Sequence, residues 1–224
     1  MNQVVIDSWY FFKNNAKELC AFMLPIFALG MISGVISVIN PESGILGVLT
    51  VVQFMIGPLF TGGLLLLIAN ISKGNSPAHK EMLTQALPFW MTIFIVSILT
   101  GMAIAFGFMF LIIPGVFFLL RLFLAPLYVV FQNKSVSDAI SSSFNDSKDH
   151  MLAFLQTLAP FIVLGVVLFM FMLGNRGEAP SFFSVIVLNL ATIFWFIFSG
   201  VIQFRLYTVY IENQSNESEP SDLS

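Results

Sequence analysis

Residues 112–150 read IIPGVFFLLRLFLAPLYVVFQNKSVSDAISSSFNDSKDH, and the rest of the chain is organised around this segment. A tight Pro114-Gly115 turn leads into an apolar run that contains one arginine, Arg121, and one proline, Pro126. The run ends in a polar segment whose apolar residues recur at helical spacing. An apolar run that starts directly after a Pro-Gly turn predicts a helical hairpin, and the rest of the chain reads as variations on this unit.

The composition is that of an integral membrane protein. Of the 224 residues, 58% are hydrophobic and only 9% are charged, whereas soluble domains carry about 25% charged residues. The net charge of −3 gives no basic excess, so nucleic acid is not an expected partner. The single cysteine, Cys20, excludes an internal disulfide and a cysteine metal site, and we expect it to be a small buried hydrophobe.

Apolar stretches of spanning length follow one another along the chain, since a transmembrane helix needs about 20 residues. The six predicted spans cover about residues 19–39, 45–71, 89–113, 116–131, 151–173 and 182–204. We therefore predict an all-α polytopic bundle of six transmembrane helices in one membrane domain, residues 1–211. Breaks are expected at Pro58 and Pro126. The polar tail 212–224 is predicted to be a disordered cytoplasmic segment.

Short amphipathic segments precede the first, third and fifth spans, at residues 4–19, 72–87 and 135–144. Ser76, which is followed by Pro77, is the predicted N-cap of the second segment. Ser135, with Asp138 three residues later, is the predicted N-cap of the third. Amphipathic helices beside spans lie in the headgroup plane. We expect three such interfacial helices.

The distribution of basic residues predicts the topology. The segments before the odd-numbered spans contain six lysines: Lys13, Lys17, Lys73, Lys80, Lys134 and Lys148. The connections on the other side contain only Arg176. Because positive residues stay on the cytoplasmic side, both termini and all three amphipathic segments are predicted to be cytoplasmic.

The spans also suggest an internal repeat. Each odd-numbered span has a proline near its start, at Pro25, Pro88 and Pro160, and spans four and six share an Arg-Leu pair. One interpretation is three copies of a unit made of an interfacial helix, a span, a turn and a span, packed around an axis along the membrane normal. The other is coincidence, because apolar sequences align readily with one another.

Arg121 is the one charge well inside a predicted span, and no span contains an acidic residue. A charge near the bilayer centre costs at least about 2.5 kcal/mol, so it must face the bundle, water or headgroups. Arg121 then either joins helices or reaches the outer headgroups, or it binds a lipid phosphate or an anionic solute. Arg205, at the cytoplasmic end of span six, and Gln53, in span two, are the other candidate lipid or solute contacts.

Other polar residues form no recognisable reactive site. His79 and His150 lie in separate polar segments without metal-ligand spacing, and Asp138, Asp146 and Asp149 are spread along one segment. We interpret all five as solvated side chains. The sequence has no nucleophile elbow, phosphate-binding loop or metal motif, so no catalytic, cofactor or metal residue is predicted.

The opening stretch resembles a known bacterial family. The residues that carry the resemblance are Ile113-Pro114-Gly115, Arg121-Leu122, Ala125-Pro126-Leu127, residues 133–139 and Ser143. They are similar to the uncharacterised inner-membrane protein family typified by enterobacterial YciC, and more distantly to the membrane domain fused to some glycerophosphodiester phosphodiesterases. Relatives often have Glu-Gly where this chain has Gln132-Asn133. The resemblance implies an inner-membrane location, with no established function or functional residues. The chain has no phosphodiesterase domain, so that activity is not carried over.

Two functional hypotheses follow. The first is a non-enzymatic envelope protein that contacts membrane lipids, other membrane proteins or a second copy of itself, because the chain has amphipathic helices but no reactive cluster. The second is a transporter or channel for a small or amphiphilic solute with Arg121 in its pathway, because the chain has broken spans and a possible parallel repeat. A membrane-embedded enzyme has the least support.

Overall fold

The computed structural model describes residues 3–174 and 181–212, so the tail 213–224 and Arg176 lie outside the described residues. Within these ranges the chain is helical and has no strand, which confirms the all-α prediction. The elements are α1 (Gln3–Ile39), α2 (Gly44–Ser72), α3 (His79–Ala86), the 3₁₀ turn η1 (Leu87–Phe89), α4 (Trp90–Phe110), α5 (Ile112–Leu122), α6 (Ala125–Gln132), α7 (Val136–Asp146), α8 (Met151–Gly174), α9 (Phe182–Tyr207) and the π-helical turn η2 (Thr208–Glu212).

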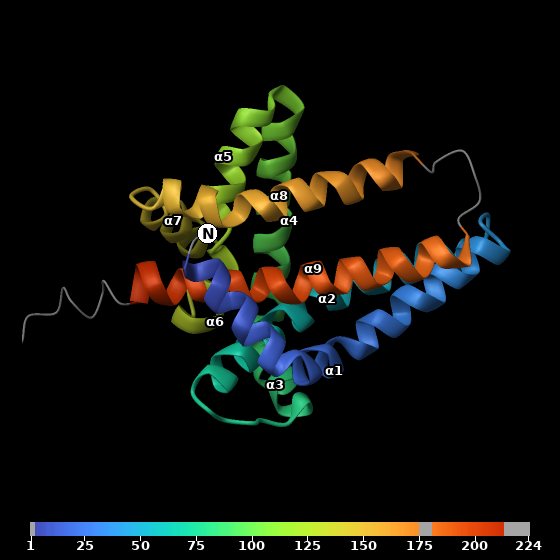
Figure 1. Cartoon of the computed structure of the whole chain (residues 1–224), viewed down its shortest axis with the longest axis horizontal. Coiled ribbons are helices and arrows are strands. Elements are labelled where there is room, and N and C mark those ends of the chain that lie inside the picture. Colours follow the sequence, from blue (N-terminus) through green and yellow to red (C-terminus); the bar gives the residue numbers. More distant parts are fainter. Residues whose placement is uncertain (1–2, 175–180, 213–224) are drawn as a thin grey trace, which may run out of the picture.

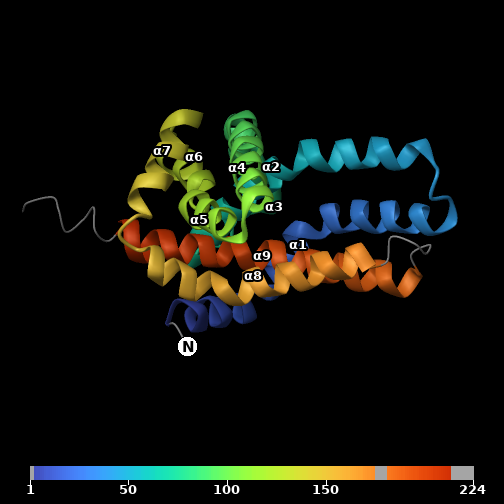
Figure 2. The ribbon, with the colours of Figure 1, turned by 90° about the horizontal axis from the view of Figure 1, so that it is seen from above.

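The helices have the length and composition of membrane spans. Among the described residues, five helical stretches are long and apolar enough to cross a membrane, and a sixth is obtained if α7 and α8 count together across their 102° bend. In Figure 1 the long helices α1, α2, α8 and α9 extend in one general direction. The α4–α5 hairpin projects across them, and Figure 2 shows this hairpin closer to end-on.

The hairpin turn lies earlier than predicted. Leu111 is the only residue between α4 and α5, and its backbone is extended (φ −162°, ψ 158°). Pro114 and Gly115 therefore fall in the first turn of α5, where proline is tolerated because its missing N–H is not needed. A Cβ on Gly107 would lie 2.8 Å from the Gly115 Cα atom, so the two backbones meet at this point. The hairpin prediction is confirmed, but the turn is at Leu111.

Four local predictions in the first half of the chain are wrong. The first interfacial helix and first span form one continuous helix, α1, which contains Pro25 and changes direction along its length (Figure 1). Helix α2 continues through Pro58 without a break. Helix α3 is preceded by Ala78, with no side-chain cap, so Ser76 does not cap it. Cys20 is exposed rather than buried, which in a membrane places it against lipid or another surface.

The amphipathic segments pack in a pattern that favours a repeat. Each one contacts the last helix of the preceding unit: α3 contacts α2, α7 contacts α6, and the start of the chain lies in α1, which contacts α9. Each also buries two residues four positions apart, which are Val4 and Ser8, Met82 and Ala86, and Ala139 and Ser143. The hairpins are less regular, because the middle one points away from the other two (Figure 1).

The buried core lies where α2, α6 and α9 meet. Leu64 and Ile68 of α2, Leu127 of α6 and Ile202 of α9 are almost fully enclosed. The far ends of α1 and α2 instead expose side chains such as Ile39 and Val48. In lipid this exposure costs little, because acyl chains are as apolar as leucine and helices associate through packing and polar contacts.

Candidate functional site

The fourth predicted span is broken in its middle, as Pro126 predicts. Helix α5 ends at Leu122 and α6 begins at Ala125, because proline has no backbone N–H to continue the helix and its ring crowds the preceding turn. The Leu127 N–H donates to the Leu124 carbonyl at 3.0 Å rather than to the carbonyl of Phe123. The break therefore leaves carbonyl groups without their usual helical partners, among them those of Arg121 and Phe123.

Side chains from two other helices satisfy these carbonyls. The Ser143 Oγ of α7 donates to the Arg121 carbonyl oxygen at 2.8 Å. The Ser147 Oγ lies 3.3 Å from the same oxygen, but its single O–H is nearer to the Ser143 carbonyl oxygen, at 2.7 Å. The Gln203 Nε2 of α9 donates to the Phe123 carbonyl. A carbonyl left unpaired in an apolar environment costs free energy, so these contacts join α7 and α9 to the broken span.

Arg121 lies under α7. Its Cζ atom is 4.4 Å from the centroid of the Phe144 ring and 5.4 Å from that of Phe117. The residue is only 8% exposed, and its Nε and Nη1 atoms are enclosed without a hydrogen-bond partner in the described structure. Arg121 therefore does not extend to the outer headgroups, because α7 covers it.

The aromatic rings offset only part of the cost of burying this charge. Cation–π contacts contribute about 0.5–2 kcal/mol each. Each enclosed donor left without an acceptor costs about 1–3 kcal/mol, and more where the group is charged. Two such nitrogens, Nε and Nη1, have no acceptor among the described residues. The environment of Arg121 is thus electrostatically incomplete.

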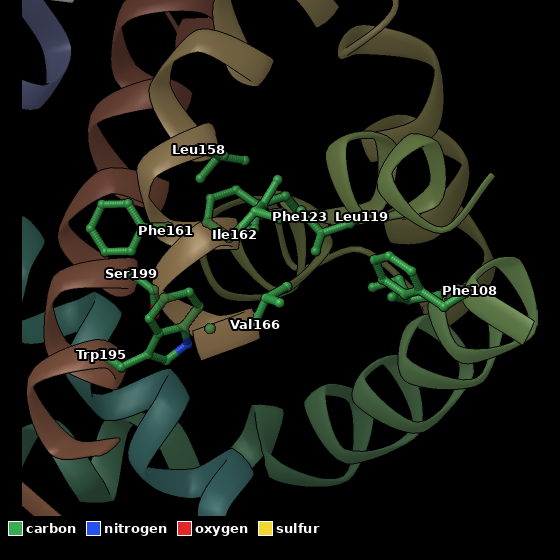
Figure 3. Close-up of a pocket in the computed structure, with 11 residues that line it drawn as sticks. Phe108, Leu119, Phe123, Leu158, Phe161, Ile162, Val166, Trp195 and Ser199 are labelled. Carbon is green, nitrogen blue, oxygen red and sulfur yellow. The ribbon is translucent and has the colours of Figure 1, made fainter. Parts of the chain in front are cut away.

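An apolar cavity lies on the other side of the broken span, between α4, α5, α8 and α9 (Figure 3). Its volume is about 640 Å³, which is within the range of about 300–1,000 Å³ typical of small-molecule sites. Its lining is almost wholly aliphatic and aromatic and includes Phe108, Leu119, Phe123, Phe161, Ile162 and Trp195. Ser199 contributes the one hydroxyl among the described lining residues, and it donates to the Phe196 carbonyl at 2.9 Å.

Arg121 is not among the described residues that line this cavity. Leu119 and Phe123 are four positions apart and face it together. Arg121 is two positions from each, which corresponds to roughly 200° around a helix of 3.6 residues per turn. The cavity and the arginine therefore lie on opposite sides of the broken span.

The other two predicted contact residues are elsewhere. Gln53 donates from Nε2 to the Ser33 Oγ at 3.0 Å and joins α2 to α1. The Cζ atom of Arg205 lies 5.5 Å from the centroid of the Phe11 ring, at the α1–α9 contact. The structure does not bring Arg121, Arg205 and Gln53 together, and the contacts of the last two join helices.

A polar cleft of about 380 Å³ is a feature that the sequence did not reveal. Its lining includes Gln132, Asp146, Asp149, His150, Tyr207 and Glu212. Asp146 accepts a hydrogen bond from the Tyr128 hydroxyl, and the Gln132 Nε2 donates to the Tyr207 hydroxyl at 2.8 Å. Asp146 is therefore a partner of the broken span rather than a purely solvated side chain. The only sequence signal was its spacing of three residues from Ser143.

The histidines predicted to be solvated have aromatic neighbours. The ring centroid of His150 lies 4.8 Å from that of Tyr210, and that of His79 lies 5.7 Å from that of Phe22. Within the described residues, His, Cys, Asp and Glu form no group of three or more that could hold a metal ion.

Comparison with known proteins places the chain in a family. The model of the uncharacterised protein family UPF0259 matches residues 43–209, which is more than half of the chain. A UPF0259 membrane protein of Pectobacterium carotovorum is 25% identical over 153 residues, covering 68% of this chain and 60% of the relative. One of Buchnera aphidicola is 26% identical over 162 residues, covering 72% and 65%, and one of Yersinia pestis is 28% identical over 186 residues, covering 79% and 70%.

The chain thus spans less than two thirds of the length of the first two of these relatives. No solved structure gives a significant match. The similarity to the membrane domain of glycerophosphodiester phosphodiesterases stays a prediction. The matched region runs from Ser43, the N-cap of α2, to the turn that follows α9, and so includes the broken span, α7 and the apolar cavity. The chain belongs to the UPF0259 family of uncharacterised membrane proteins.

Proposed function

We propose that this chain is a non-enzymatic membrane protein that holds a lipid acyl chain in the cavity between α4, α5, α8 and α9. The cavity itself carries the proposal. It has room for a small-molecule ligand, its lining is apolar, and the helices around it have the composition of membrane spans. The medium that surrounds such helices consists of acyl chains, so the ligand is already present at high concentration.

The proposed location is the bacterial inner membrane with both termini in the cytoplasm, as the lysine distribution predicts. Contacts with other membrane proteins or with a second copy belong to the same proposal. The transporter alternative gains nothing specific from the cavity, because Arg121 is not among the described lining residues. The transporter alternative predicts solute flux in proteoliposomes, whereas a protein that only binds lipid should give no flux.

The test is native mass spectrometry of protein extracted in dodecyl maltoside. The wild-type chain should retain a lipid. The double variant Ile162→Trp, Ser199→Phe places larger side chains in the cavity and should lose it. Val163→Trp is the matched control, because Val163 is the neighbour of Ile162 on α8 and is 63% exposed. Equal lipid retention by a folded double variant, or no lipid on the wild-type chain, would refute the proposal.

A further inference from the structure

Arg121 has a fixed positive charge and unused donors. The Nε and Nη1 atoms have no acceptor in the described structure, and the residue is more than nine-tenths buried. Arginine stays protonated in proteins, so the charge cannot be removed by losing a proton as it could for a buried lysine. Both enclosed nitrogens therefore require an acceptor from outside the described residues, and the acceptor that best matches a guanidinium is an oxyanion.

We propose that Arg121 is a binding site for a phosphate oxyanion, reached from the surface groove beside α7. The guanidinium presents several N–H donors in one plane, which suits the oxygens of a phosphate. Phosphate headgroups and inorganic phosphate share this chemistry. The acidic side chains of α7 are a poorer match, because Asp146 accepts a hydrogen bond from the Tyr128 hydroxyl and Asp138 accepts one from the Ser135 hydroxyl.

The groove beside α7 provides the route. It has a volume of about 730 Å³ and is lined by Leu99 of α4 and by Ile140, Ser141 and Phe144 of α7. Arg121 is not among the described residues that line the groove, and Phe144 separates the two, because it lines the groove and covers the guanidinium at 4.4 Å. The route therefore requires this half-buried ring to rotate. The apolar side chains suit a lipid tail, and the Ser141 hydroxyl can donate to a phosphate oxygen.

This site is separate from the acyl-chain cavity, because Arg121 and the cavity-lining residues Leu119 and Phe123 face opposite sides of the broken span. The two proposals can therefore fail independently. The Ile162→Trp, Ser199→Phe variant should lose binding in the cavity and keep binding at the phosphate site. Substitutions at Arg121 should lose binding at the phosphate site and keep binding in the cavity.

The experiment uses the full chain in dodecyl maltoside, a detergent without phosphate. One arm adds short-chain phosphatidylglycerol and the other adds inorganic phosphate, with binding followed by native mass spectrometry and ³¹P NMR line broadening. Arg121→Met removes the charge, and Arg121→Lys keeps the charge but removes the planar fork. Lys134→Met is the matched control, because Lys134 is also a cation over an aromatic ring, 4.7 Å from Tyr128, but has a hydrogen-bond partner in Ser142 at 2.7 Å.

The expected result is at least a tenfold loss of phosphate affinity in Arg121→Met, a smaller loss in Arg121→Lys and no change in Lys134→Met. Binding of phosphatidylglycerol alone identifies a lipid headgroup as the ligand, and binding of both probes identifies phosphate itself. Equal binding of each probe to wild type and to folded Arg121→Lys and Arg121→Met overturns the proposal, as does an absence of binding to wild type. If Arg121→Met does not fold, the comparison of wild type, Arg121→Lys and Lys134→Met decides.

Discussion

The joint between α7 and the broken span makes a quantitative prediction. In the double variant Ser143→Ala, Ser147→Ala, the carbonyl of Arg121 loses its hydroxyl donor at 2.8 Å and the only other hydroxyl near it in the described structure, at 3.3 Å. Both serines are almost fully buried, so water does not replace them readily. An average side-chain hydrogen bond in a membrane protein contributes about 0.6 kcal/mol, but a buried acceptor left without a donor costs about 1–3 kcal/mol. The cost of an acceptor left without a donor applies to the double variant. The average contribution of one hydrogen bond is closer to the loss expected for Ser143→Ala alone.

We therefore expect the free energy of unfolding to be lower by about 2 kcal/mol in the double variant. For a chain of this length, 1 kcal/mol corresponds to roughly 2–4 °C in Tm, so the Tm should fall by about 4–8 °C. The assay is thermal unfolding in dodecyl maltoside, followed by helical circular dichroism. Ser141→Ala is the control, because Ser141 is exposed on the same helix. A double variant that unfolds at the same temperature as Ser141→Ala would show that the hydroxyls do not hold α7 in place.

Three further predictions concern the hairpins and the topology. Gly107→Ala should lower the Tm by about 2–12 °C in the same assay, because its Cβ meets backbone at 2.8 Å and overpacking costs about 1–3 kcal/mol. Gly101→Ala, with nothing within 4 Å, should be neutral or stabilising. Equal losses in the two variants would contradict the close approach of the helices at Gly107. Gln53→Leu removes the hydrogen bond between Gln53 and Ser33 and should weaken the α1–α2 contact by about 0.6 kcal/mol. Chemical unfolding measures this loss, and an unchanged unfolding midpoint would show that the bond does not stabilise the contact. In a background without the native cysteine, Glu42→Cys should react with an impermeant thiol reagent added outside the cell, and Lys80→Cys should not. The opposite labelling would show that the predicted topology is inverted.

Some local features were predictable because their causes lie within a few residues. Pro126 breaks its helix through its own missing N–H. Ser135 caps α7 as expected: its hydroxyl accepts from the Asp138 N–H at 3.3 Å. The buried face of α7, which contains Ala139 and Ser143, follows from helical periodicity. The hairpin turn was misplaced because Pro-Gly suits either a turn or the first turn of a helix, and only the approach of Gly107 to α5 decides between them.

The partners of the broken span could not be predicted in this way. The donor to the Arg121 carbonyl is 22 residues away in sequence, and the donor to the Phe123 carbonyl is 80 residues away. Serine and glutamine occur throughout membrane helices, so neither type indicates which carbonyl it will find. The burial of Arg121 has the same origin, because it depends on where α7 packs rather than on the residues beside it.

Membrane residence, the all-α class and the break at Pro126 could all be predicted from the amino-acid sequence. These follow from hydropathy, helical period and backbone chemistry, all of which act locally. The direction of the α4–α5 hairpin, the apolar cavity and the enclosure of Arg121 became visible only in the packed fold. Because lipid and protein interior are equally apolar, hydrophobicity does not select which helix faces pair. That choice depends on close packing and on a few hydrogen bonds between distant parts of the chain.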